Sequence, residues 1–145
     1  MKRIAFAIAG LALATLMLTG CPVNQSQQQK AANAVHIALT AGVGVQNAEL
    51  SAYQNHLIPA DDHLIIQEGF LTLGRSATVA DTCINLAATS DGVVGCVNNI
   101  ISTVDNLNND GVLHLKSAEA KADYAAAMQS IKAALSVITV VIGGK

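Results

Sequence analysis

Apolar side chains recur at alternating steps of three and four residues along most of this chain. After Pro59 the apolar positions are Ile66, Phe70, Leu73, Ala77, Ala80, Ile84 and Ala87. Before Gly143 the same spacing is repeated by Tyr124, Met128, Ile131, Leu135, Ile138 and Ile142. A helix with 3.6 residues per turn places such positions on one face. We therefore expect each segment to form a helix whose apolar face is buried against other helices.

Two further segments carry the pattern with smaller side chains. The segment from Lys30 to Leu57 has alanines at three- and four-residue steps, which let a neighbouring helix approach closely. Gly42 and Gly44 each weaken a helix by roughly 1 kcal/mol relative to Ala, so a bend or a tight contact is expected there. The other segment places Val93, Val97, Ile100, Val104 and Leu107 on one face.

Turn signals divide these segments into four expected helices, at about 30–57, 60–88, 92–108 and 117–142. Short connections between helices favour antiparallel neighbours. The sequence thus predicts an all-α fold, a compact antiparallel four-helix bundle.

The expected helix boundaries rest on local chemistry. Pro59 followed by two acids is typical of a helix start, and Thr89–Gly92 has the composition of a turn. Asn106–Gly111 is expected to end the third helix in a turn, with Val112–Leu115 extended after it. Ser117 is a good N-cap for the last helix.

The N-terminal residues have the features of a targeting signal. Lys2 and Arg3 precede an uncharged apolar run, Ile4–Leu18, which is short for a bilayer span of ~20 residues. Leu18-Thr19-Gly20-Cys21 then resembles the lipobox of bacterial lipoproteins. The resemblance implies a signal peptide at 1–20, lipidation of Cys21 with acyl chains such as palmitate, and a flexible tether at 21–29 before a bundle domain at 30–145. The alternatives are an ordinary secretory signal cut elsewhere and a retained N-terminal anchor.

Lipidation would determine the location of the protein. Several acyl chains hold a protein stably on a membrane, whereas one chain does not. The residue after Cys21 is Pro22 rather than the Asp that favours inner-membrane retention, so the resemblance implies the outer membrane, facing the periplasm, in a Gram-negative source. In composition and layout the domain also resembles small uncharacterised helical lipoproteins of bacterial envelopes, a likeness that transfers no active residue.

Charge and aromatic content limit the kinds of partner. Loss of residues 1–20 removes Lys2 and Arg3, leaving six basic and ten acidic residues and a net charge of −4. A domain without a basic cluster is poorly suited to nucleic acid. Only 3% of residues are aromatic and there is no Trp, so platforms for stacking bases or sugars are scarce.

Cys83 and Cys96 are expected to form a disulfide, because the predicted compartment is oxidising. They lie seven residues before and six residues after Ser90, so an antiparallel helical hairpin would bring them level. Closing so short a loop stabilises a fold by ~3 kcal/mol in the chain-entropy model. A metal pair or a redox pair is the alternative, but the spacing is not Cys-x-x-Cys.

Two groups of residues resemble metal sites. Asn106–Ser117 follows an EF-hand loop at several positions, but Asn106 and Ser117 stand where that loop carries its first Asp and its bidentate Glu, so calcium affinity should be poor. His56, Asp61, Asp62 and His63 surround the first interhelical turn and could hold a metal such as zinc. The two acids also suit helix initiation, so we assign no metal ligand and no cofactor.

These features favour a lipid-anchored, non-enzymatic binding or structural module of the cell envelope. We expect the membrane as a partner through the lipid, an envelope protein as a further partner, and no nucleic acid. One alternative is a metal-dependent periplasmic protein using His56, Asp61, Asp62 and His63. Another is a membrane-anchored inhibitor that protects against a toxin, lysin or phage. The sequence contains no catalytic motif that identifies a reaction.

Overall fold

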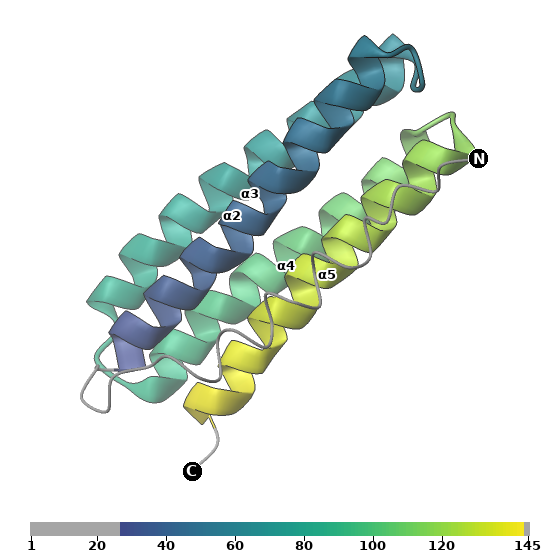
Figure 1. The fold of residues 1–145 in the computed structure, drawn as a ribbon. Coiled ribbons are helices and arrows are strands. Elements are labelled where there is room, and N and C mark those ends of the chain that lie inside the picture. The colour runs from purple at the N-terminus through teal and green to yellow at the C-terminus, as the bar shows by residue number, and fades with distance from the viewer. Residues whose placement is uncertain (1–26, 144–145) are drawn as a thin grey trace.

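The computed structural model describes residues 27–143, which form four helices (Figure 1). Their bounds are α2 Gln27–Gln54, α3 Ala60–Leu86, α4 Ser90–His114 and α5 Ala118–Gly143. The predicted all-α four-helix architecture is confirmed. The lipobox, Cys21 and most of the predicted tether lie outside the described residues.

Successive helices run antiparallel and pack side by side, and α5 closes the bundle by packing against α2 (Figure 1). The start of α2, the α3–α4 connection and the end of α5 therefore lie at one end of the bundle, which we call the proximal end. The α2–α3 turn and the α4–α5 connection lie at the opposite, distal end. The largest fully buried side chains come from α3, α4, α5 and the α4–α5 connection: Leu73, Ile84, Leu115, Met128, Leu135, Val93, Val97, Val104 and Asp62.

Local chemistry explains most helix ends. Pro59 precedes α3 in an extended conformation, with Asp61 and Asp62 in the first turn. The Thr89 hydroxyl accepts the Gly92 N–H at 3.1 Å and caps α4. The Ser117 hydroxyl accepts the Ala120 N–H at 3.3 Å, which confirms the predicted cap of α5.

The first helix differs from its predicted bounds at both ends. It begins at Gln27 rather than Lys30, because the side-chain amide of Gln28 donates to the Ala87 carbonyl just after α3 and so ties this turn to the bundle. It ends at Gln54 rather than Leu57, because the chain turns at His56, whose φ of 58° is left-handed.

The predicted turn at Asn106–Gly111 and the extended stretch Val112–Leu115 are wrong, since α4 continues without interruption to His114. The turn-forming side chains of Asn106, Asn109 and Asp110 point to solvent, where they cost a helix little. The inner face of the same turns continues the apolar stripe of Val104 to Gly111. Packing of that stripe overrides the weak local preference for a turn.

Two glycines make room for the one buried tyrosine. The ring of Tyr124 extends from α5 between α3 and α4, is only 2% exposed, and meets Phe70 edge-on at 6.2 Å. A Cβ atom at Gly111 would lie 2.3 Å from Tyr124 Cε1, and one at Gly69 would lie 2.3 Å from Tyr124 Oη. Neither position can hold a larger residue without displacing the ring.

The tight contact expected at Gly42 or Gly44 is not found, whereas the expected disulfide is present. A Cβ atom at Gly42 would lie 3.6 Å from the Phe70 ring, which is an ordinary van der Waals distance, and nothing lies within 4 Å at Gly44. Cys83 and Cys96 are joined as a disulfide with their Cα atoms 5.8 Å apart, which links α3 to α4 as the spacing predicts.

Candidate functional site

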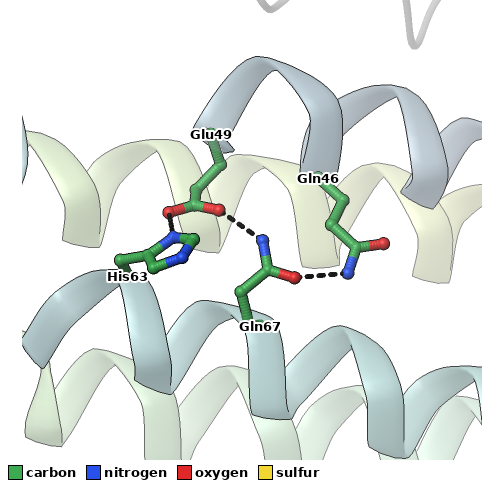
Figure 2. Close-up of polar contacts among 4 residues, drawn as sticks. All are labelled: Gln46, Glu49, His63 and Gln67. Atoms are coloured by element: carbon green, nitrogen blue, oxygen red, sulfur yellow. Dashed lines mark hydrogen bonds and ion pairs between the residues drawn. The ribbon is translucent and has the colours of Figure 1, made fainter. Parts of the chain in front are cut away.

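The main polar cluster inside the bundle lies between α2 and α3 (Figure 2). Glu49 Oε1 is 2.6 Å from His63 Nδ1, and Glu49 Oε2 accepts a hydrogen bond of 2.6 Å from the Gln67 side-chain amide. Gln67 Oε1 in turn accepts one of 2.6 Å from Gln46. Four side chains thus form one continuous chain of hydrogen bonds across the interface.

Burial makes these contacts energetically important. Glu49 is only 8% exposed, and the His63 ring is stacked on Tyr53 with 4.1 Å between the ring centroids. Burying a carboxylate is costly unless its oxygens are hydrogen bonded. Both oxygens of Glu49 have a partner, so the cluster fixes the register of α2 against α3.

A histidine oriented by a carboxylate is also the acid–base half of many catalytic centres. Such a centre needs a nucleophile or a substrate group beside the second ring nitrogen. In residues 27–143 the side-chain partners of His63 are Glu49 and the Tyr53 ring. These contacts connect α2 to α3.

The sequence interpretation missed Glu49, although a signal was present. Glu49 follows Val45 and Ala48 on the small-residue stripe of the first helix, where a charge requires a buried partner. His63 and Gln67 are four residues apart and so share one face of the next helix. A charged residue on an apolar stripe opposite such a pair is the pattern that could have identified the contact.

Asp62, in the first turn of α3, caps the start of α5, although the two lie far apart in sequence. It is fully buried, and its two carboxylate oxygens accept the N–H groups of Lys116 and Ser117, each at 2.8 Å. The neighbouring Asp61 points outward and forms an ion pair with the Lys116 side chain. The hydrogen bond and positive charge of Lys116 lower the pKa of Asp61, and the same contact raises the pKa of Lys116.

The four residues considered as candidate metal ligands consequently point to different places. Asp62 faces the α4–α5 connection, Asp61 faces solvent and His63 faces α2. His56 is exposed in the α2–α3 turn. Throughout the described part of the chain, no three His, Cys, Asp or Glu side chains form a group that could hold a metal ion. The EF-hand-like segment Asn106–Ser117 is mostly helix, so it cannot wrap around a calcium ion.

Two of the surface grooves formed by residues 27–143 are candidate binding sites. One, of about 380 Å³, lies between α2 and α3 beside the polar cluster and is edged by the exposed side chains of Val43 and Leu71. The other, of about 360 Å³, lies between α3 and α4, with Glu68 and Asp110 beside Tyr124. Burial, together with the nearby charge of Asp110, raises the pKa of Tyr124 to about 12, so its hydroxyl stays protonated.

Comparison of the chain with protein-family models, curated proteins and solved structures finds no match.

Proposed function

We propose that this chain is a lipid-anchored, non-enzymatic module of the bacterial cell envelope that binds or supports another envelope component. The observation that carries the proposal is the order of Leu18-Thr19-Gly20-Cys21 after a positively charged start and an apolar run. Lipid on Cys21 would hold the protein on the membrane. In a Gram-negative cell, Pro22 after the cysteine favours the outer membrane facing the periplasm.

The distance from Cys21 to the bundle supports this proposal. The first described helix begins six residues after Cys21. Six residues of fully extended chain span at most roughly 20 Å, so an anchored bundle would remain close to the lipid headgroups. A module held there meets partners at the membrane.

The α2–α3 groove is the surface best suited to an envelope partner. Val43 and Leu50 on α2 and Leu64 and Leu71 on α3 are exposed along this side. Exposed aliphatic side chains beside a groove are typical of protein contact sites. The metal-dependent alternative has no comparable support, because its four residues face different surroundings.

Replacing Cys21 tests the proposal. The full chain and its Cys21→Ser variant are produced in a bacterial host, and the mass of the N-terminal peptide and the membrane-bound fraction are measured. We expect a diacylated or triacylated Cys21 in the parent chain. The variant should be an unprocessed, larger precursor without lipid.

A Ser26→Ala variant, changed in the predicted tether, is the matched control and should be processed normally. Normal processing of the Cys21→Ser variant, or a parent chain that carries no lipid on Cys21, would overturn the proposal.

A further inference from the structure

The last three turns of α5 have an apolar outer surface. Val137, Val140 and Val141 are 42%, 71% and 58% exposed, and the exposed Ala133 precedes them. We call these four residues the α5 tip. No charged residue occurs from Ala133 to Gly143. Side chains of this kind are more stable out of water than in it.

The hydroxyl groups near the α5 tip are already hydrogen bonded within the helix. Ser136 Oγ donates to the Lys132 carbonyl at 2.9 Å, and Thr139 Oγ1 donates to the Ser136 carbonyl at 2.8 Å. Neither hydroxyl therefore needs water as an acceptor for its proton. The side chains of this end of the helix can enter an apolar environment at little cost in lost hydrogen bonds. The last backbone carbonyls of α5, which have no partner within the helix, would stay at the level of the hydrated headgroups.

Hydropathy agrees with this description. Within residues 27–143, α5 is the one helix long and apolar enough to cross a membrane by length and composition, over Ala118–Ile142. Its inner face belongs to the core of the bundle, with Met128 and Leu135 fully buried. However, only 33% of the residues in the most apolar 18-residue stretch of α5 are buried. The other helices therefore leave much of its apolar surface uncovered.

The α5 tip lies at the end of the bundle where α2 begins (Figure 1). Gly42 on α2 is level with Ile131 on α5, since a Cβ atom at Gly42 would lie 3.7 Å from Ile131 Cδ1. From this contact, α2 runs fifteen residues back to Gln27 and α5 runs twelve residues on to Gly143. Antiparallel helices with equal rise per residue therefore bring Lys30 level with the end of α5, and place Gln27 about one turn beyond it.

We propose that the α5 tip inserts into the headgroup and acyl boundary of the membrane on which Cys21 is anchored. The inference rests on the proposed anchoring, because the lipid would hold the proximal end within roughly 20 Å of the bilayer. Aliphatic side chains bind this boundary by burial. None of the four residues of the α5 tip is charged, so the contact that they make would depend on burial of aliphatic surface.

Photolabelling from within the bilayer tests the contact. Membranes from cells that produce the full chain receive a phospholipid with a photoreactive diazirine in its acyl chain, and labelled peptides are identified by mass spectrometry. We expect about fivefold more label in the peptide that contains Val140 and Val141 than in the peptide that contains Leu113. Leu113 is also an exposed aliphatic residue, but it lies at the distal end.

Two double variants provide a matched comparison. Val140→Gln with Val141→Gln should reduce labelling of α5 about fivefold, because the apolar surface that enters the boundary is lost. Leu57→Gln with Leu113→Gln removes as many exposed aliphatic side chains at the distal end and should leave labelling of α5 unchanged. Circular dichroism of each variant checks that the bundle remains folded.

The same samples separate failure of this inference from failure of the anchor. Lipid on Cys21 without label on the α5 tip would overturn the membrane contact and leave the anchoring intact. Absence of lipid on Cys21 would overturn both. Crosslinks between the α5 tips of two chains, in place of lipid adducts, would show that a second copy covers this surface and would also overturn the inference.

Discussion

At the scale of single residues, Glu49 depends most on particular partners. It brings a carboxylate into the interface between α2 and α3, where it is only 8% exposed, and two hydrogen bonds offset the cost. Removing one partner leaves an oxygen buried without a donor, which costs more than the net value of the bond itself. Comparing the loss of one partner with the loss of both therefore shows whether a buried polar contact is specific.

We expect His63→Ala to lower the free energy of unfolding by about 1–3 kcal/mol, because Glu49 Oε1 loses its donor and Tyr53 loses its stacking partner. Urea denaturation followed by circular dichroism measures the effect. The double variant Glu49→Leu with His63→Leu removes both polar partners and should lie closer to the parent protein. Equal loss in the single and double variants would show that the Glu49–His63 contact contributes nothing specific.

Gly111→Ala should be destabilising by about 1–3 kcal/mol, because the added methyl group overlaps the Tyr124 ring. The exposed Gly95 lies on the same helix with nothing within 4 Å of its Cβ position, so it is a matched control. Gly95→Ala should raise stability by about 0.5–1 kcal/mol through helix propensity. Thermal unfolding of both variants compares them directly, and a stabilising Gly111→Ala would contradict the close packing around Tyr124.

At the scale of helices, the end of α4, the third of the four described helices, was the hardest to predict from sequence. Asn106, Asn109 and Asp110 favour a turn locally, yet α4 continues through them. Asn109→Pro tests the difference, because proline inside a helix costs roughly 3 kcal/mol and proline in a turn is tolerated. Chemical denaturation should show a loss of this size, whereas Asn109→Ala should be neutral or stabilising. Equal stability of the two variants would favour the turn.

Strong apolar periodicity allowed the helices and their neighbours to be predicted, because each apolar stripe has few ways to be buried. The cysteine spacing about Ser90 similarly anticipated the link between Cys83 and Cys96. Contacts that join residues far apart in sequence could not be predicted in this way. Asp62 reaches the start of α5, fifty-four residues away at Lys116, and no local pattern indicates that contact. The four candidate metal ligands are near one another in sequence, which suggested a common site. Nearness in sequence does not fix the direction of side chains on a helix, and in the structure the four side chains point to different places.

At the scale of the whole molecule, the proposed anchor and the proposed membrane contact both act at the proximal end. The other end then extends away from the bilayer by up to the length of the bundle. The 27 residues of α3 span about 40 Å at 1.5 Å per residue. The α2–α3 groove with its polar cluster would face the aqueous space along this length, where a soluble or membrane-bound partner can reach it.

This orientation predicts unequal access to the two ends of the anchored protein. A short protease recognition sequence is inserted after His56 in the distal turn or after Ala88 in the proximal turn, both of which are exposed in the bundle. With the protein in sealed vesicles that display it outward, added protease should cut the distal insertion several-fold faster, because the bilayer hinders approach to the proximal one. Detergent should make the two rates similar, because it removes the bilayer. Equal rates on intact vesicles would mean that the bundle does not hold its proximal end against the membrane.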